Sequence, residues 1–230
     1  MIQRYSHFLF DADETLFRFD AYAGLKLMFS QYGVDFTRSD FETYQTVNQP
    51  LWIRYQNGDI SADALQTTRF NAWASTLGVS ANELNDRFLD SMATICKPLD
   101  GTHELIKYLM SHRKSLTIVT NGFTALQERR LKQTGLWTAF DHVIVSEEVG
   151  HAKPSHHFFD HTFEKLGLDH KDKPQILMIG DTLSSDILGG INAGIDTCWV
   201  NHHHATSGDI RPTYNVSDLH QLLALLQAGS

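Results

Sequence analysis

The second half of the chain alternates short apolar runs with stretches of helical periodicity, and this pattern restricts the fold more than any other feature. Apolar runs of strand length occupy 116–120, 142–146, 176–181 and 197–201, and the first three are each followed by a helical segment. Near-continuous apolar strands that alternate with helices are typical of a parallel sheet buried on both faces. The sequence therefore predicts an α/β fold, with a Rossmann-like parallel sheet sandwiched by helices.

A first strand is expected over 8–10, after which a long helical segment interrupts the alternation. Glycines and capping residues divide residues 18–95 into predicted helices over 21–32, 38–56, 62–77 and 81–95. We interpret this segment as an inserted all-helical cap domain, a four-helix bundle over the sheet. The predicted core domain then consists of residues 1–17 and 96–230.

Net charge and cysteine usage narrow the class of protein. The 230 residues carry a formal net charge of −8, which argues against binding of polymeric nucleic acid, because such binders normally present a basic stripe. Cys96 and Cys198 stand in no CxxC arrangement and suit a reducing compartment. Neither a signal peptide nor a run of roughly 20 apolar residues is evident. We expect a cytoplasmic protein without membrane contact, and a homo-oligomer is possible.

Polar residues follow the first two predicted strands, at the edge where an open parallel sheet binds its ligand. Asp11 ends the first strand, and its carboxylate could attack phosphorus to give an acyl phosphate. Asp13 lies on the same side of an extended chain and could protonate the leaving group, then activate water. Thr120, Asn121 and Gly122 could cradle phosphate at a helix start. An acidic turn and a plain helix cap are the alternatives.

Later strand ends add a cation and two more acids. Lys153 could neutralise phosphoryl charge, although most lysines are solvated surface charges. Asp181 could complete an oxygen-ligand site for Mg²⁺, and Asp186 could bind a water of the ion or hold the lysine. Capping and exposed helical acids are the alternatives here. Together these groups form the set that phosphoryl transfer requires, which favours the functional interpretation.

The order of these motifs resembles that of the haloacid dehalogenase-like hydrolase superfamily, whose phosphatases carry DxDxT, T/S, K and GDxxxD. The matching residues are Asp11, Asp13, Thr15, Thr120, Lys153, Asp181 and Asp186. The stretches DADETLF, VNQPLW with YQNG, TNGFT, SEEVGHAKP and GDTLSSDILGGINAG followed by TCWVNHHH are similar to the bacterial pyrimidine 5'-nucleotidase branch. The resemblance implies a phosphatase acting on nucleoside monophosphates, since dehalogenase members lack the second aspartate.

The same resemblance implies a role for each matching residue. Asp11 would be the nucleophile and Asp13 the general acid and base. Mg²⁺ would be held by Asp11, by the backbone carbonyl of Asp13 and by Asp181. Phosphate would be bound by Thr120, the Asn121 backbone, Gly122 and Lys153, with Thr15 and Asp186 in support. One departure is Glu14, where many members have glycine; a carboxylate there is unfavourable unless it points away or pairs with a cation.

Substrate contacts outside the motifs are less specific. Phe17, Phe19, Asn48, Gln49 and Trp52 are candidates for contact with a base, although aromatic residues at helical spacing more often form a bundle core. Three consecutive histidines at 202–204 suit a loop at the rim of the site rather than a metal site. Histidines on the predicted helix near 156–166 are expected to face solvent; they are His156, His157 and His161.

Four other functions remain as alternatives. Within the superfamily, the chain could be a sugar-phosphate phosphatase or a mutase. A phospho-acceptor module with Asp, Thr and Lys on a parallel sheet is more remote, because such modules are shorter and have no helical insertion. A non-catalytic binding protein on the same fold is disfavoured by the complete set of acids and lysine. In each hydrolytic case the partner is a small phosphate monoester and the cofactor is Mg²⁺.

Overall fold

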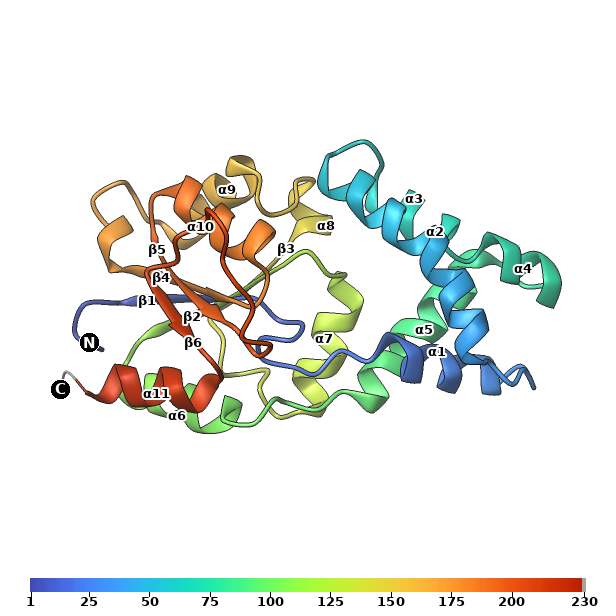
Figure 1. The fold of residues 1–230 in the computed structure, drawn as a ribbon, viewed down its shortest axis with the longest axis horizontal. Coiled ribbons are helices and arrows are strands. Elements are labelled where there is room, and N and C mark those ends of the chain that lie inside the picture. Colours follow the sequence, from blue (N-terminus) through green and yellow to red (C-terminus); the bar gives the residue numbers. More distant parts are fainter. Residues whose placement is uncertain (229–230) are drawn as a thin grey trace.

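The computed structural model describes residues 1–228, within which six parallel strands form one sheet in the order β3-β2-β1-β4-β5-β6 (Figure 1). The strands are β1 (His7–Phe10), β2 (Ser115–Thr120), β3 (His142–Val145), β4 (Ile176–Gly180), β5 (Asp196–Val200) and β6 (Tyr214–Val216). The predicted parallel sheet is confirmed. The run at 197–201 forms β5, and a further strand that the sequence did not predict, β6, pairs with it at the edge of the sheet. With three residues, β6 is too short to produce a recognisable sequence pattern.

The central strand of the sheet determines where a ligand can bind. Phe10 at the end of β1 pairs with Ile118 of β2 on one side and with Ile179 of β4 on the other. The chain continues from β1 to β2 on one side, and it later crosses from β3 to β4 on the other side of β1. This arrangement opens a crevice at the carboxyl ends of the strands. The residues that follow β1, β2 and β4 all reach that crevice.

Helices cover both faces of the sheet (Figure 1). One face packs against α6 (Thr102–Ser111), α7 (Thr124–Gln133) and α11 (Leu219–Gln227), and the other against α9 (His156–Leu166) and α10 (Leu188–Ala193). Short elements complete this body: α8 (Ser146–Val149), the 3₁₀ turn η1 (Lys173–Gln175) and the π-helical turn η2 (Leu183–Ile187). Strand side chains such as Phe8 and Leu9 are fully buried on opposite faces, which confirms a sandwiched sheet.

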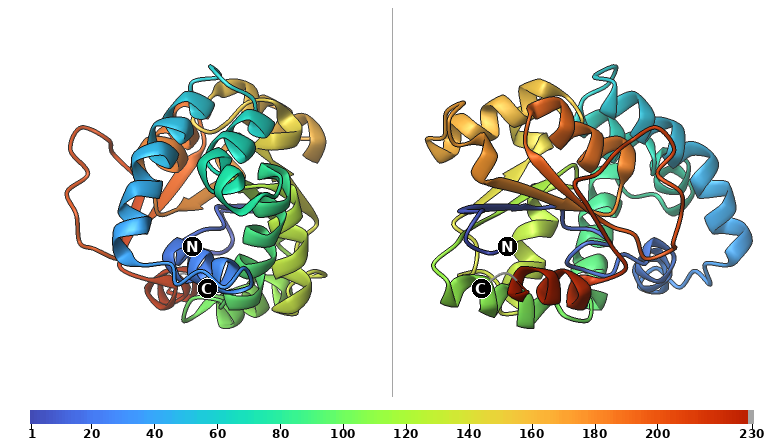
Figure 2. Two further views of the ribbon diagram at one scale, coloured as in Figure 1. Left: turned by 90° about the vertical axis from the view of Figure 1, so that its right-hand side faces the viewer. Right: turned by 60° about the vertical axis from the view of Figure 1, so that its left-hand side comes forward.

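A second group of helices stands beside the carboxyl edge of the sheet and has an apolar core of its own (Figures 1 and 2). It consists of α1 (Ala21–Ser30), α2 (Arg38–Gln56), α3 (Ala62–Thr68), α4 (Asn71–Leu77) and α5 (Ala81–Ile95). The single helix predicted over 62–77 is wrong, because the chain breaks at Arg69 and Phe70. A continuous helix turns successive side chains by about 100°. The break instead lets both consecutive side chains lie in the interior.

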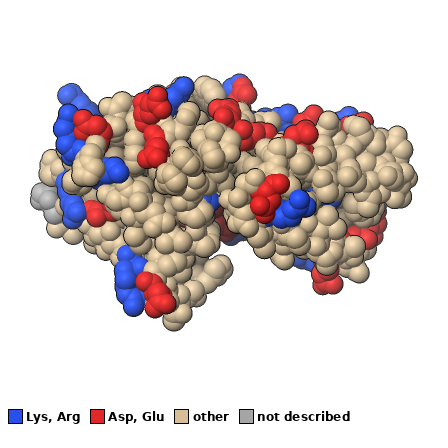
Figure 3. Space-filling model, turned by 90° about the horizontal axis from the view of Figure 1, so that it is seen from above, with Lys and Arg blue, Asp and Glu red and all other residues tan. Residues whose placement is uncertain are grey.

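The helical group packs against the sheet body mainly through α5 on α7. The connection 201–213 between β5 and β6 projects from the sheet body near the same edge (Figure 2). On the face seen from above, acidic and basic side chains are interspersed, without a basic stripe (Figure 3). None of the helices within residues 1–228 combines the length and the apolar character that a bilayer crossing requires.

Candidate active site

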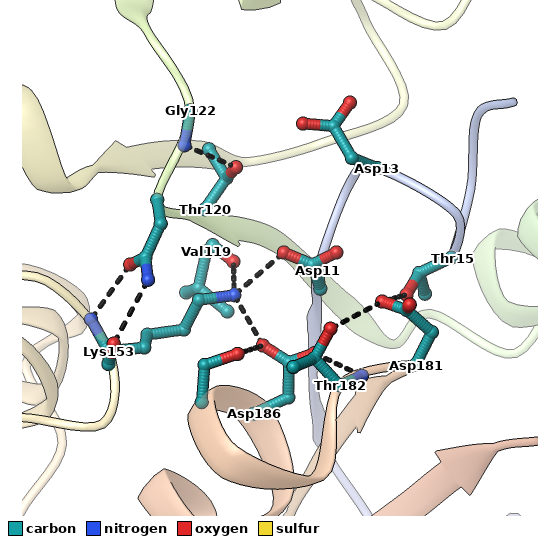
Figure 4. A network of polar contacts seen from close by, with 12 residues as sticks. Asp11, Asp13, Thr15, Val119, Thr120, Gly122, Lys153, Asp181, Thr182 and Asp186 are labelled. Carbon is teal, nitrogen blue, oxygen red and sulfur yellow. Dashed lines mark hydrogen bonds and ion pairs between the residues drawn. The ribbon is translucent and has the colours of Figure 1, made fainter. Parts of the chain in front are cut away.

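A buried lysine joins two carboxylates at the carboxyl edge of the sheet (Figure 4). The Nζ atom of Lys153 lies 2.7 Å from Asp11 Oδ1 and 2.8 Å from Asp186 Oδ1, and it donates to the Val119 carbonyl at 2.6 Å. Lys153 is only 1% exposed. With three acceptors around three N–H donors, the ammonium group is fully satisfied. The lysine therefore fixes the orientation of the Asp11 carboxylate.

The loop that carries Lys153 is attached to the end of β2. Asn121 accepts a hydrogen bond from the Lys153 backbone N–H at 2.7 Å and donates to the Lys153 carbonyl at 2.9 Å. Thr120 Oγ1 accepts from the Gly122 backbone N–H at 3.0 Å. A Cβ atom on Gly122 would lie 2.7 Å from Gln127 Nε2, so a larger residue here would displace the Gln127 side chain. The side chain of Asn121 is thus occupied by the lysine loop, which leaves its backbone at the mouth of the site.

The two acids that follow β4 are held by the turn after the strand. Asp181 accepts from Thr15 Oγ1 at 3.4 Å and from Thr182 Oγ1 at 3.3 Å. Asp186 accepts from the Thr182 backbone N–H at 3.0 Å. The π-helical turn η2 directs Asp186 inward, and a Cβ atom at Gly180 would lie 2.4 Å from it. Local structure therefore packs both acids against the end of β1.

Burial and mutual repulsion shift the titration of these acids. Burial, opposed by Lys153 and reinforced by the charges of Asp186 and Asp181, raises the pKa of Asp11 to about 8. Burial and the charge of Asp186 raise the pKa of Asp181 to about 7. For Lys153, burial alone would lower the pKa, but the two ion pairs outweigh burial and raise it. One lysine does not balance this concentration of negative charge.

The carboxylates match the ligand set of a hard divalent cation. One oxygen from each of Asp11, Asp181 and Asp186 lies within 4.8 Å of the others. Mg²⁺ prefers a few carboxylates together with water and phosphate oxygens. Acids whose charge is disfavoured by burial and like charges are the groups that a cation would stabilise. The donor set and its electrostatics therefore fit magnesium.

Asp13 lies apart from this cluster. Its carboxylate points away from Asp11 and forms an ion pair with Arg130 of α7 (Figure 4). Arg130 is buried, stacks over the Phe17 ring at 4.7 Å and donates from Nε to Gln127 Oε1 at 2.9 Å. Arg130 and Gln127 were missed by sequence analysis. No signal distinguishes Arg130 from its half-buried neighbour Arg129, which pairs with Asp90, because their different environments come from packing of α7.

A cavity of about 280 Å³ opens over these groups. Its lining includes the predicted residues Asp11, Asp13, Thr120, Asn121, Gly122, Lys153, Asp181 and Asp186. The structure therefore places these eight predicted residues around one cavity, although Asp13 points away from Asp11 instead of sharing its side as expected. Thr15 lies beneath Asp181.

Only two of the five base-contact candidates line this cavity, namely Phe19 and Trp52. The other three candidates do not line it. Phe17 is buried beneath Arg130. Asn48 hydrogen-bonds Tyr44 and Gln45, and Gln49 faces solvent.

Glu14 and the histidines considered in the sequence analysis also have defined positions. Glu14 has a left-handed backbone, with φ 56°, and its carboxylate accepts from the Phe19 N–H, so it does not point at the lysine. The Nε2 atom of His202 lies 2.9 Å from the Glu14 carbonyl oxygen. This position at the rim is the one expected for a loop at the edge of the site. The histidines of α9, His156, His157 and His161, are exposed as predicted.

Comparisons with known proteins agree with this geometry. The family model of haloacid dehalogenase-like hydrolases matches residues 5–194. The chain is 51% identical over 218 residues to pyrimidine 5'-nucleotidase YjjG of Escherichia coli, covering 94% of this chain and 96% of the relative. It is 36% identical over 227 residues to pyrimidine 5'-nucleotidase PynA of Streptococcus pneumoniae, covering 96% of this chain and 95% of the relative.

A solved structure of similar architecture is that of the HAD-hydrolase YfnB from Bacillus subtilis. It matches with a TM-score of 0.83 at 33% identity, covering 97% of this chain and 99% of that chain. That crystal structure is described as bound to magnesium and as revealing interdomain movement. Since the family model spans most of the sequence and the relatives align almost end to end, this protein belongs to the haloacid dehalogenase-like hydrolase family.

Proposed function

We propose that this hydrolase is a Mg²⁺-dependent 5'-nucleotidase that releases phosphate from pyrimidine nucleoside monophosphates, in ribo or deoxy form. The observation that carries the phosphatase assignment is the pairing of buried Lys153 with Asp11 at the base of a cavity that Asp13, Thr120 and Asp181 also line. The nucleotidase assignment is supported by the likeness to YjjG and PynA, both described as pyrimidine 5'-nucleotidases.

In the proposed reaction, an Asp11 carboxylate oxygen attacks phosphorus while the ester P–O bond breaks. Asp13 gives its proton to the leaving alkoxide, then takes one from the water that attacks the aspartyl phosphate. This second step releases inorganic phosphate and restores both carboxyl groups. Lys153 orients Asp11 and offsets the phosphoryl charge, and the Thr120 hydroxyl with backbone N–H groups at Gly122 binds phosphate oxygens.

We propose that Asp11, Asp181 and the backbone carbonyl of Asp13 hold magnesium, with Thr15 and Asp186 fixing these groups. Magnesium bound there supplies positive charge that neutralises the phosphoryl oxygens and polarises phosphorus. The residues contribute orientation: Thr15 donates to Asp181, and Asp186 holds Lys153.

We also propose that residues 18–95 act as a cap domain on a core of residues 1–17 and 96–230. Two polar contacts support a closed arrangement: Tyr55 Oη lies 2.7 Å from Ser146 Oγ, and Gln66 Nε2 donates to Glu147 Oε1 at 2.6 Å. Both join helices of the insertion to α8 of the core. Closure of this kind excludes bulk water from the reacting groups.

A substrate panel tests the proposed function. We expect kcat/KM for UMP, CMP and dTMP to exceed that for ribose 5-phosphate and glucose 6-phosphate by about tenfold or more, the effect of about 1.4 kcal/mol of base contact. Phosphate release is measured at saturating Mg²⁺. Equal or higher values for the sugar phosphates would identify a sugar-phosphate phosphatase instead.

Metal dependence has a readout apart from activity. Because the pKa values of Asp11 and Asp181 are raised to about 8 and about 7, the metal-free protein should lose stability as pH rises from about 4 toward 8. Mg²⁺ should therefore raise Tm more at pH 8.5 than at pH 6, where protons compete for the site. Asp181→Asn should lose most of this shift. A wild-type Tm that does not change with Mg²⁺, or full activity in excess EDTA, would contradict the proposed metal site.

The ion pair of Asp13 with Arg130 indicates that Arg130 is a positioning residue. We expect Arg130→Met to lower kcat by about 100-fold, the lower range for loss of acid–base catalysis, with KM nearly unchanged. The matched control Arg129→Met, at the half-buried neighbour that pairs with Asp90 instead of Asp13, should stay within about twofold. The loss should shrink for p-nitrophenyl phosphate, whose good leaving group needs little protonation. An equal loss for both ester types would indicate a merely structural role.

A further inference from the structure

A third buried cation besides Lys153 and Arg130 is Arg69, which stands between α3 and α4 and has no acidic partner among the described residues. The side chain is 5% exposed, and none of the ion pairs within residues 1–228 includes it. Its Nη2 donates to Asn85 Oδ1 at 2.5 Å, whereas its buried Nε has no hydrogen-bond partner among the described residues. The rings of Phe70, Phe88 and Phe123 lie 5.1–5.2 Å from its guanidinium carbon and offset part of the cost of burial. Burying a cation without a counter-charge still costs several kcal/mol, which a ligand acceptor would lower.

Arg69 lines a small cavity that adjoins the active site. This cavity, of about 30 Å³, shares Asp13, Phe19, Trp52 and Gly122 with the larger one over Asp11. Its volume accommodates one or two water-sized groups, which suits a single carbonyl oxygen better than a carboxylate or a second phosphate. The guanidinium therefore lies where this small cavity extends into the cap from the phosphate loop, which consists of residues 120–122.

The surroundings of Arg69 favour a planar ligand. Phe123, which follows Gly122 of the phosphate loop, lies with its ring 5.1 Å from the guanidinium carbon, and Trp52 packs on the same ring at 5.4 Å. Phe19 is 36% exposed at the boundary of the two cavities. Aromatic faces beside an opening stack on nucleobases. Aromatic rings and a hydrogen-bond donor together fit a heterocycle with a carbonyl group.

A chain of hydrogen bonds fixes Arg69 relative to the phosphate loop. Asn85, which accepts from Arg69, donates from Nδ2 to Gln66 Oε1 at 2.7 Å. Gln66 in turn donates to Glu147 Oε1 at 2.6 Å. Glu147 Oε2 accepts from the Thr124 backbone N–H at 2.8 Å, at the start of α7. A donor held in this way is pre-organised for one ligand position.

We propose that Arg69 is a specificity-determining residue that donates a hydrogen bond to the 2-carbonyl oxygen of the substrate's pyrimidine base, with Phe19 and Trp52 beside the ring. This inference rests on the proposed nucleotidase function. All common pyrimidines carry the 2-carbonyl group next to the glycosidic nitrogen, so one donor serves uracil, cytosine and thymine alike. The carbonyl supplies an acceptor to a guanidinium whose Nε has none among the described residues.

The test compares substrates that share a ring but differ in the acceptor. Arg69→Met removes the donors at similar length, and it should lower kcat/KM for UMP and dTMP by about 10- to 150-fold, the range for one hydrogen bond to a charged group. Phenyl phosphate has a planar leaving group without a carbonyl, and its kcat/KM should change less than about threefold. Equal losses on both substrates, or no loss on either, would overturn the inference.

Measurements on the wild type keep the test decisive if the variant does not fold. UMP should exceed 2-thiouridine 5'-monophosphate, whose thiocarbonyl is a weaker acceptor, by about tenfold in kcat/KM. Equal values would overturn the proposed role of Arg69 and leave the nucleotidase function standing. Preference for phosphoglycolate would show that Arg69 takes a carboxylate instead. Turnover of phenyl phosphate without turnover of any nucleotide would overturn the nucleotidase function together with this inference.

Discussion

Asp11→Asn is expected to lower kcat for phosphate release by roughly four to six orders of magnitude while leaving the fold intact. The amide matches the carboxylate in shape but cannot attack phosphorus to form the acyl phosphate. Lys153 keeps its contacts with Asp186 at 2.8 Å and with the Val119 carbonyl at 2.6 Å. The expected loss therefore comes from chemistry and not from collapse of the site.

The thermal stability of Asp11→Asn distinguishes loss of the chemical step from collapse of the site. Burial and neighbouring acids raise the pKa of Asp11 to about 8, so its charge is unfavourable in the metal-free protein. We expect the Tm of Asp11→Asn in EDTA at pH 8.5 to equal or exceed that of the wild type. Asp209→Asn, at an exposed loop residue, is the matched control and should change neither property. Release of phosphate by Asp11→Asn within about tenfold of the wild-type rate would refute the assignment of Asp11 as the nucleophile.

Most of the candidate site could be predicted because its residues occupy strand ends. Asp11, Thr120 and Asp181 each follow an apolar run, and parallel pairing of β1, β2 and β4 brings such positions to one edge. Local pattern and topology thus determine the meeting point. The contact of Lys153 with Asp11 needed only the further assumption that its loop returns to the same edge.

Other features depend on packing that no local pattern records. Arg129 and Arg130 are adjacent on α7, yet one is half-buried and pairs with Asp90 of α5, whereas the other is buried and pairs with Asp13 after β1. The break at Arg69 and Phe70 lies within a segment of helical periodicity and arises from burial of both side chains. Sequence analysis therefore predicted the elements of the insertion better than its contacts.

Lys153→Met is expected to abolish turnover and to lower the free energy of unfolding by about 3–5 kcal/mol, the usual cost of removing one partner of a buried ion pair. The ammonium group is the cation that faces both Asp11 and Asp186, and those carboxylates would otherwise repel each other in a buried setting. Urea unfolding in EDTA measures the loss without a contribution from metal. Lys171→Met, which removes an exposed ion pair with Asp169, is the control and should change stability by less than about 0.5 kcal/mol.

A second substitution shows whether charge or packing is responsible. Adding Asp186→Asn to Lys153→Met removes one uncompensated carboxylate and should recover part of the lost stability, while turnover stays absent. The loss caused by Lys153→Met alone should also be smaller at pH 5.5 than at pH 8.5, because protonation of the acids relieves their repulsion at the lower pH. A double variant no more stable than Lys153→Met, with a loss independent of pH, would mean that Lys153 stabilises the fold by packing of its alkyl chain rather than by neutralising the acids.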